Sequence, residues 1–498
     1  MEPARGRAND ESLDSVEARE PASNWTSTAG LYDSSFDIVD MPTHRMQNAP
    51  MPAPVVYQAI TDLLQFDRNP RLNLGSFVTT YMDPEANQLI QDTLNINFAD
   101  SEVYPSSTEI EKRCVHILGD LFNVPDAGQA HGTSTVGSSE GCLLGGLNMK
   151  KRWADKRKAA GLSTDSPNMV ISYADQVVWE KFCAYFDVEA RHCCLEEGRY
   201  LMTAGQVAAL CDANTIGVVA IFGSTYTGGL EDVEGMGRVL DELQSSKGLD
   251  IPIHVDGASG GMIAPFLFPG IKWDFRVPRV LSISVSGHKY GFVYPGVGWL
   301  LYHSSESMHA SLRFHMAYLG SDQQSLTFNF SRPACFVIAQ YYNFLRMGRY
   351  GYRQVCQNTM SVACKLAEAL DGIGRFRLLN DPRTGPSLPL VAFTLKKQCD
   401  EVEGGGLVCR QTFSEFDLSV RLVCWRRETM TCMRVVVRLD MSMSTMQQLV
   451  THIKAALVWL DAHFKHISAD DKAHITRAVN PHRTPSNLSD LKKAHGAC

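Results

Sequence analysis

The chain of 498 residues lacks several features that would place it in a special class. No apolar run approaches the roughly 18 to 20 residues that a helix needs to cross a bilayer, so we expect no membrane span. The first 20 residues contain acids and arginines but no apolar stretch, which predicts neither a secretory signal nor an acid-poor transit peptide. Together these absences predict a cytoplasmic protein.

The 14 cysteines lack the spacing of a metal site. They form no Cys-x-x-Cys pair, and several, such as Cys114 and Cys142, lie inside apolar runs, which predicts reduced, buried thiols and no bound metal. A strong basic excess is also missing, because the net charge is -7 and Lys and Arg are scattered along the chain. Since a nucleic-acid-binding face needs clustered basic residues, we expect no nucleic-acid partner.

The chain does have enough apolar sequence, 44% of its residues, to bury a sizeable core. Between about residues 130 and 300, short apolar runs alternate with helix-sized segments. The runs span 169–172, 216–222, 251–255, 280–285 and 297–302. Apolar strands separated by helices predict an α/β fold with a large, mostly parallel sheet that carries helices on both faces.

The remaining sequence predicts an arm, a second domain and a tail. Residues 1–70 form the arm, whose polar and weakly periodic start predicts partial disorder and contacts with other subunits. The large domain should then span 71–350. Residues 351–464 follow a helix, strand and helix pattern that predicts a smaller α+β domain, and 465–498 are a polar tail.

Lys289 follows one of the strand-like runs after a short turn. An ammonium at the end of a buried strand loses several kcal/mol of hydration unless it is paired, neutralised or consumed. A Schiff base with the aldehyde of pyridoxal phosphate would consume it. That cofactor also needs a carboxylate at its ring nitrogen, an anion site for its phosphate and a flat group over its ring.

Asp256 is the candidate carboxylate, because it ends another strand-like run and small residues follow it. An ionised Asp256 would keep the ring nitrogen protonated and make the ring an electron sink for a carbanion. A strand-end aspartate that caps a turn is the alternative interpretation. The presence of Lys289 at a matching position favours the role in cofactor binding.

The Gly- and Ser-rich segment 132–141 precedes an apolar helical run and predicts an anion site. Ser138 and Ser139 would offer backbone N–H groups at a helix N-terminus, where the helix dipole favours an anion by about 0.3–1 kcal/mol at exposed ends. A plain serine N-cap is the alternative interpretation.

Four more polar residues near strand ends complete the predicted cofactor surroundings. Gln176 would lay its flat amide over the ring, while Thr225 and Ser286 would donate hydrogen bonds to the ring oxygen or the phosphate. His288 would assist proton transfer or contact a substrate carboxylate. Each has a structural alternative, namely a solvated glutamine, hydroxyls bonded to nearby backbone, and a structural histidine.

With these segments in order, the chain resembles the pyridoxal-phosphate-dependent group II decarboxylases, and within them the glutamate decarboxylase type of bacteria, plants and fungi. The resemblance runs from about residue 73 to about residue 460. Besides the aspartate and lysine motifs, its most specific stretches are Asn-Leu-Gly-Ser-Phe-Val-Thr-Thr-Tyr-Met at 73–82, Ile-Asn-Phe-Ala-Asp-Ser-Glu-Val-Tyr-Pro at 96–105, Gly-Ser-Ser-Glu at 137–140, Phe-Gly-Ser-Thr-Tyr-Thr-Gly at 222–228 and Asn-Phe-Ser-Arg-Pro at 329–333.

The resemblance implies a fold-type I pyridoxal phosphate enzyme. It implies a cofactor site, with the roles given above, made of Lys289, Asp256, Ser138, Ser139, Gln176, Thr225, Ser286 and His288. In the family, the serine that matches Ser331 reaches the phosphate of a neighbouring subunit. This implies a homodimer as the minimal active unit, and relatives of this type often assemble further into hexamers.

The resemblance also implies that L-glutamate is converted to 4-aminobutanoate and carbon dioxide. Ser76, Phe77 and Asp100 match the family positions that bind the distal carboxylate, and Arg438 matches the position that binds the α-carboxylate. Because two carboxylates in contact cannot both stay ionised, we expect a shared proton and mildly acidic operation. A turn residue before the next helix is the alternative interpretation of Asp100.

The segment 314–327 resembles a mobile family loop, which makes Tyr318 a candidate proton donor. Two departures from the family pattern are visible. Position 76 is serine where many relatives have threonine, and this change keeps the hydroxyl. Residues 465–498 contain no tryptophan and lack the apolar face of the calmodulin-binding helix in plant relatives, so calmodulin control is not supported.

Two rival functions are weighed against the glutamate decarboxylase interpretation. A related decarboxylase of an aromatic or sulfinic amino acid is disfavoured by the stretch at 96–105. A non-catalytic relative that serves as a scaffold should have lost Lys289 or Asp256, and both residues are present.

Overall fold

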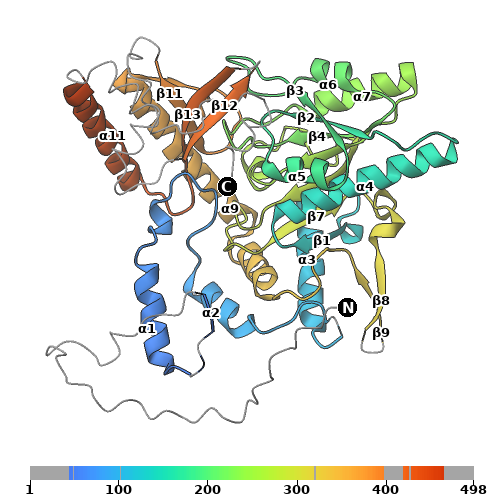
Figure 1. Cartoon of the computed structure of the whole chain (residues 1–498), viewed down its shortest axis with the longest axis horizontal. Helices are drawn as coiled ribbons and strands as arrows, with labels where there is room; N and C mark the ends of the chain where they lie inside the picture. Colours follow the sequence, from blue (N-terminus) through green and yellow to red (C-terminus); the bar gives the residue numbers. More distant parts are fainter. Residues whose placement is uncertain are drawn as a thin grey trace, which may run out of the picture. The chain divides into compact units, whose positions relative to one another are not determined.

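The computed structural model describes residues 44–46, 48, 50–100, 102–318, 321–396, 419–425 and 428–464 (Figure 1). Two compact units, 1–68 and 69–498, divide the chain. In the first unit, helix α1 (Ala53–Leu64) has a proline in its first turn, where the missing N–H is tolerated. Most of the predicted arm and the whole predicted tail lie outside the described residues.

The second unit contains the remaining described elements. Its helices are α2 (Pro84–Thr93), α3 (Pro105–Leu121), α4 (Ser138–Ala159), α5 (Val177–Tyr185), α6 (Ala204–Leu210), α7 (Val233–Lys247), α8 (Ala264–Leu267), α9 (Cys335–Ile373) and α11 (Met443–Phe464). Its strands are β1 (His131–Thr135), β2 (Asn168–Ser172), β3 (Glu189–Cys193), β4 (Thr215–Ile221), β5 (Ile253–Asp256), β6 (Val280–Val285), β7 (Gly298–Tyr302), β8 (Phe314–Tyr318), β9 (Ser321–Ser325), β10 (Phe376–Leu378), β11 (Leu390–Leu395), β12 (Ser419–Trp425) and β13 (Glu428–Val436).

The large sheet has seven strands in the order β1-β7-β6-β5-β4-β2-β3. The strands from β3 to β6 pair in parallel, while β7 pairs antiparallel with both of its neighbours. This arrangement confirms the predicted large, mostly parallel sheet. The predicted strands correspond to β2, β4, β5, β6 and β7, whereas β1 and β3 were not predicted.

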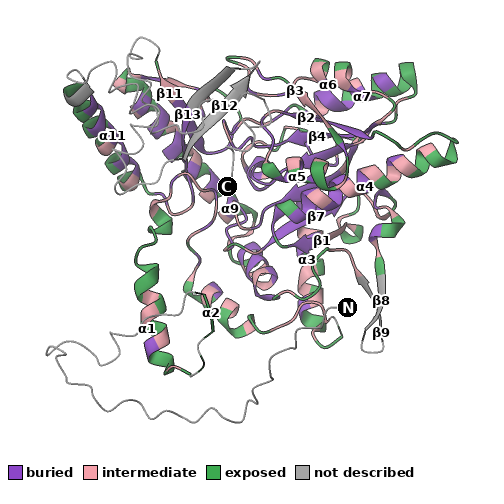
Figure 2. Ribbon diagram, in the orientation of Figure 1, coloured by how far each residue is buried: buried purple, intermediate pink, exposed green. Residues whose placement is uncertain are grey.

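Strand β4 shows that the sheet is covered on both faces (Figure 2). Val219 and Ile221 pack in a cluster with residues of α4 and α5, whereas Val218 and Ala220 pack in another cluster with residues of α7. Because successive side chains of a strand point to opposite faces, helices must cover both. The fully apolar sequence of β4 follows from this double burial.

The smaller antiparallel sheet has the order β10-β11-β13-β12. Its own core includes Leu366 of α9, Phe393 of β11 and Ile453 of α11. Helix α9 breaks at Gly348, whose φ of 57° and ψ of -173° are not helical. The predicted boundary between residues 350 and 351 falls beside this break and stays a prediction.

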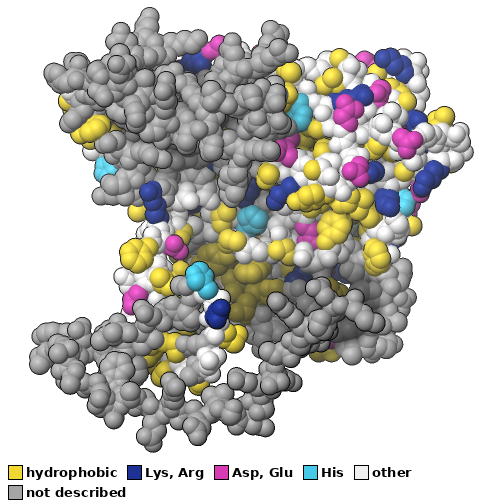
Figure 3. All heavy atoms as spheres, viewed as in Figure 1, with side chains coloured by type: hydrophobic (Ala, Val, Ile, Leu, Met, Phe, Trp, Pro, Cys, Tyr) yellow, Lys and Arg dark blue, Asp and Glu magenta, His cyan; other side chains and the backbone are white. Residues whose placement is uncertain are grey.

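Three further findings concern the described residues alone. None of the described helices combines the length and the apolarity needed to cross a membrane. The cysteines whose side chains are described are free thiols. Figure 3 shows Lys and Arg side chains beside Asp and Glu, rather than in one patch, on the described part of that face.

Candidate active site

The carboxyl ends of neighbouring parallel strands bring the predicted residues to one edge of the large sheet. Asp256 ends β5 and pairs in register with Ile221 of β4 and Ser284 of β6. Lys289 follows β6 after a turn in which its backbone N–H donates to the Ser286 carbonyl over 3.3 Å. Ligands bind beyond such strand ends in open α/β sheets.

Lys289 is half-buried and is held by contacts on both sides. Its Nζ donates to Ser259 Oγ over 3.3 Å and lies 5.4 Å from the centre of the Phe77 ring. Its carbonyl accepts a hydrogen bond of 2.8 Å from Thr79 Oγ1, and the Thr79 N–H donates to the His288 carbonyl over 2.8 Å. The segment around residue 77 therefore fixes the turn that carries the lysine.

Asp256 is buried, and each of its carboxylate oxygens accepts a hydrogen bond. Trp179 Nε1 donates to Oδ2 over 2.9 Å, and the Ala258 N–H donates to Oδ1 over 3.2 Å. These donors fix the plane of the carboxylate at the strand end. A carboxylate held in this way suits a partner that carries a proton, such as a pyridine nitrogen.

A buried polar network lies beside Asp256. The two ring nitrogens of His254 are 2.8 Å from Ser282 Oγ and 3.2 Å from Ser284 Oγ. Burial lowers the pKa of the His254 imidazole to about 4, although the nearby Asp256 opposes this shift. His254 is therefore neutral near pH 7 and brings no positive charge to the side of Asp256.

The predicted phosphate site lies at the start of α4. Gly137 precedes this helix with a φ of 94°, in the left-handed region that favours glycine. Ser138 is buried and accepts a hydrogen bond of 2.6 Å from Ser286 Oγ, while Ser139 is exposed. A Cβ atom on Gly298 would lie 2.4 Å from the carbonyl carbon of Gly137, so the loop passes very close to β7.

His288 lies beside this loop in a neutral form. Its Nδ1 is 3.0 Å from the Val297 carbonyl, which can only accept, so Nδ1 carries the hydrogen. Burial, followed by the Lys289 ammonium, lowers the pKa of the His288 imidazole to about 4. Its Nε2 is consequently a hydrogen-bond acceptor near neutral pH.

Gln176 and Thr225 meet directly, since Gln176 Nε2 donates to Thr225 Oγ1. Gln176 immediately precedes α5, and Thr225 follows β4. Arg434 of β13 donates to the Thr225 carbonyl, and its guanidinium carbon lies 4.8 Å from the Phe77 ring centre. Phe77 therefore contacts two cations, Arg434 and Lys289.

Arg438 is buried and lines a small cavity together with Phe77 and Lys289. Its Nε lies 3.3 Å from Asp440 Oδ1, and its Nη1 donates to the Ser76 carbonyl over 3.0 Å. These contacts fix the guanidinium next to the lysine. The structure thus brings Ser76, Phe77 and Arg438 to the same place.

Asp100 and Ser331 have no described contact with these residues. Asp100 Oδ1 accepts a hydrogen bond of 3.2 Å from the Val103 N–H, which is the turn geometry of the alternative interpretation. Ser331 is exposed, and its Oγ accepts a hydrogen bond of 3.4 Å from Asn97 Nδ2. Tyr318 ends β8, but its side chain lies outside the described residues.

Sequence reasoning missed four residues of the site: Thr79, Trp179, Ser259 and Arg434. Ser259 belongs to the small-residue run after Asp256, and Arg434 lies on β13, which ends at Val436, two residues before Arg438. The short sequence separation of Arg434 from Arg438 is the signal that could have found it, because residues so close along the chain lie near the same site. Trp179 and Thr79 contact the site through pairings that no local pattern indicates.

Comparison with known proteins identifies the family. Residues 42–396 match the family model described as the pyridoxal-dependent decarboxylase conserved domain. The chain belongs to this family. As a pyridoxal-phosphate-dependent decarboxylase, it is similar to curated relatives along most of its length. The residues present fit the cofactor, because a buried carboxylate, a lysine and a helix N-terminus meet at one sheet edge.

Two curated relatives and one solved structure illustrate the similarity of this decarboxylase. Glutamate decarboxylase 5 of Arabidopsis thaliana is 43% identical over 83% of each chain. Glutamate decarboxylase of Lactococcus lactis subsp. cremoris is 37% identical over 92% of this chain and 95% of the relative. The structure of Lactobacillus brevis glutamate decarboxylase is 36% identical and has a TM-score of 0.82. The match covers 87% of this chain and 98% of that structure.

Proposed function

We propose that this decarboxylase converts L-glutamate to 4-aminobutanoate and carbon dioxide. The observation that supports this substrate is the similarity, along most of the chain, to glutamate decarboxylases from a plant and from bacteria. The half-buried Lys289, the buried Arg438 and the Phe77 ring line one small cavity, and the two cations support an anionic substrate at this place.

The cofactor roles are assigned to residues that share the sheet edge. Lys289 binds pyridoxal phosphate covalently, and Asp256 holds the proton on the ring nitrogen. Ser138 and Ser139, at the start of α4, bind the phosphate, and Ser286 supports Ser138 through its 2.6 Å hydrogen bond. When bound, the cofactor supplies the electron sink that allows the α-carboxylate to leave as carbon dioxide.

The remaining roles around the cofactor are assigned to Gln176, Thr225 and His288. Gln176 would pack on the ring, and Thr225 would orient its amide, because the two side chains are hydrogen-bonded. His288 precedes Lys289 and its ring lies against Gly137, since a Cβ atom on Gly137 would be 3.1 Å from His288 Cε1. Its neutral Nε2 can accept a hydrogen bond from cofactor or substrate.

Substrate recognition is assigned to Arg438 for the α-carboxylate and to Ser76, Phe77 and Asp100 for the distal carboxylate. The fixed guanidinium of Arg438 favours an anion beside Lys289. Asp100 would face the substrate with a shared proton, which favours mildly acidic operation. Tyr318 is the proposed donor of the proton that replaces carbon dioxide.

A homodimer is proposed as the active unit, with further assembly into hexamers, in the cytoplasm. The described hydrogen bond of Ser331 is with Asn97 and not with the loop that carries Ser138. This supports a role of Ser331 in the site of a neighbouring subunit. Val136, which belongs to that loop, and Phe328 are 48% and 52% exposed. Apolar side chains exposed so close to a polar site favour a covering subunit.

The proposal is tested with the purified protein supplied with pyridoxal phosphate. Carbon dioxide release should be observed with L-glutamate and should be at least about 100-fold slower with aspartate, tyrosine or cysteine sulfinate. Lys289→Arg keeps the positive charge and should abolish both turnover and covalent cofactor binding. Faster turnover of an aromatic or sulfinic substrate would contradict the proposal.

A further inference from the structure

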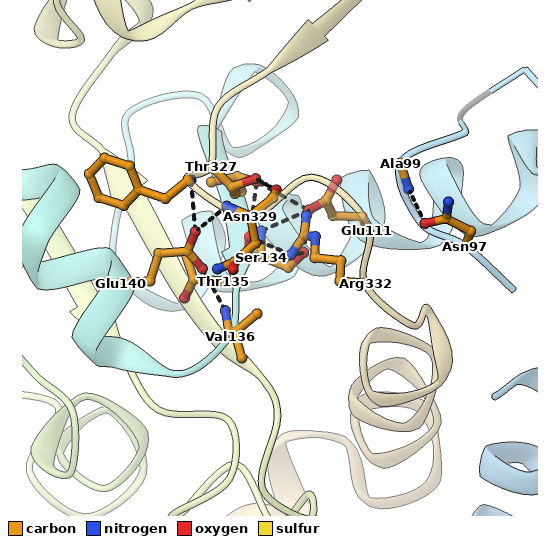
Figure 4. A network of polar contacts seen from close by, with 12 residues as sticks. Asn97, Ala99, Glu111, Ser134, Thr135, Val136, Glu140, Thr327, Asn329 and Arg332 are labelled. Atoms are coloured by element: carbon orange, nitrogen blue, oxygen red, sulfur yellow. Dashed lines mark hydrogen bonds and ion pairs between the residues drawn. The ribbon is translucent and has the colours of Figure 1, made fainter. Parts of the chain in front are cut away.

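Glu140 is a buried carboxylate two residues beyond the start of α4. Its Oε2 accepts a hydrogen bond of 2.8 Å from the Val136 N–H, in the predicted phosphate loop. Its Oε1 accepts hydrogen bonds of 2.9 Å and 3.3 Å from the N–H groups of Phe328 and Asn329 (Figure 4). One side chain therefore joins two backbone segments that are far apart in the sequence.

A second link joins the same two segments (Figure 4). Arg332 Nη1 donates to the Ser134 carbonyl over 2.9 Å and to Ser134 Oγ over 2.8 Å. Its Nη2 lies 3.5 Å from Glu111 Oε1, which also accepts a hydrogen bond of 2.8 Å from the Ser134 N–H. Residues 134–139, the phosphate loop, are thus tied to residues 327–333, the crossing segment.

The crossing segment is fixed on its other side by residues 96–98. The Phe98 N–H donates to the Arg332 carbonyl over 2.8 Å, and the Arg332 guanidinium carbon lies 4.8 Å from the Phe98 ring centre. The crossing segment, which carries Ser331, is therefore held between the phosphate loop and the stretch that leads to Asp100.

We propose that Glu140 is a positioning residue that couples the phosphate loop to the crossing segment, so that phosphate binding orders the segment and the segment strengthens phosphate binding. This role rests on the proposed function, because it presupposes that the phosphate of the cofactor binds at Ser138 and Ser139. Three N–H donors compensate the buried carboxylate, and each of them belongs to one of the two coupled segments.

Two effects of Glu140 oppose each other. Its negative charge repels a phosphate bound at the same helix terminus, whereas its hydrogen bonds hold the loop in the binding geometry. Glu140→Gln removes the charge but places an amide NH₂ against a backbone N–H. Charge alone predicts tighter phosphate binding by the variant, and the positioning role predicts weaker binding.

The first measurement compares pyridoxal phosphate with pyridoxal, which has the aldehyde but no phosphate. Both are titrated into the cofactor-free full chain and followed by the absorbance of the bound cofactor. Glu140→Gln should weaken pyridoxal phosphate about 10-fold to 100-fold and pyridoxal less than about 3-fold. An equal loss for both compounds would indicate a merely structural role, and tighter pyridoxal phosphate binding would indicate charge alone; either result overturns the proposal.

Asp155→Asn is the matched control. It removes one negative charge from the same helix, but the Asp155 side chain is 63% exposed and pairs with His309. Its binding of both compounds should equal that of the unmodified chain. Glu140→Asp keeps the charge but has a shorter side chain. Its affinity for pyridoxal phosphate should lie between those of the unmodified chain and Glu140→Gln, which keeps the test valid if the glutamine variant folds poorly.

The second measurement follows amide hydrogen exchange at Phe328 and Asn329. Pyridoxal phosphate should slow this exchange in the unmodified chain, and pyridoxal should not. In Glu140→Gln the slowing should disappear, and equal slowing in both proteins would refute the coupling. Neither measurement requires turnover, so failure of the unmodified chain to bind pyridoxal phosphate would instead count against the proposed function.

Discussion

Three titratable side chains, the buried Glu231 and His254 and the half-buried His288, make the stability of the folded chain depend on pH with opposite signs. Glu231 accepts hydrogen bonds from the N–H groups of Ile221 (2.7 Å) and Met202 (3.2 Å), and its burial raises its pKa to about 8. Burial lowers the pKa values of His254 and His288 to about 4. The folded chain therefore keeps a proton on the acid and excludes protons from the histidines.

These shifts predict greatest stability of the cofactor-free chain near pH 6.5. Between pH 4 and 6.5 the unfolded state binds one more proton at each histidine, so stability rises with pH and outweighs the opposite effect of Glu231. Between pH 6.5 and 8 the folded state binds one more proton at Glu231, so stability falls by up to about 1.4 kcal/mol per pH unit.

Urea unfolding at a series of pH values measures this profile. Glu231→Gln should be less stable than the unmodified chain at pH 5, because an amide cannot accept hydrogen bonds from both N–H groups. The stability of the variant should also no longer fall between pH 6.5 and 8. A fall of the same steepness in the variant would show that another group is responsible.

At the scale of single residues, the sequence indicated the strand-end positions of Asp256 and Lys289 better than the side chains that contact them. Asp256 and Lys289 follow apolar strands, and the rule that parallel strands present their carboxyl ends together is enough to find them. Thr79 contacts the Lys289 turn across 210 positions of sequence. No local pattern indicates such a pairing, because it depends on how the segments pack after the sheet has formed.

At the scale of elements, burial decided which strands could be predicted. The strands β2, β4, β5 and β6 lie inside the sheet and need apolar residues on both faces, so their runs stand out. The edge strands β1 and β3 read His-Gly-Thr-Ser-Thr and Glu-Ala-Arg-His-Cys. Because an edge strand is partly solvated, its sequence looks like a loop.

The break in α9 gives a prediction at this scale. Gly348→Ala should destabilise the chain by about 1–3 kcal/mol, because its φ of 57° with a ψ of -173° is strained for any residue with a Cβ atom. Gly372→Ala in the same helix has open space around the added Cβ atom and should stabilise it by about 0.5–1 kcal/mol. Denaturant unfolding measures both, and a neutral Gly348→Ala would refute the strain.

At the scale of the whole molecule, the exposed apolar side chains near the phosphate loop favour a covering subunit. Phe330, which is 42% exposed in the crossing segment, lies next to Ser331. A charge placed at this position leaves the core of the single chain intact but opposes the burial of the segment against a second copy. The assembly and the activity are therefore expected to fail together.

Phe330→Asp should yield monomers at micromolar concentration and reduce carbon dioxide release at least about 10-fold. Light scattering after size-exclusion chromatography measures the assembly. Leu162→Asp, at a position that is 54% exposed after α4, should leave mass and activity unchanged. An active monomeric Phe330→Asp variant would contradict the need for a second subunit.

The hydrogen bond from Trp179 to Asp256 has an optical consequence. The indole donates to the carboxylate assigned to the cofactor ring, so only one side chain separates the fluorophore from the bound cofactor. Energy transfer between groups this close is efficient, and the emission of Trp179 should be quenched when the cofactor is present. The fluorescence of Trp179 should therefore report how much of the protein has bound the cofactor, without any added label.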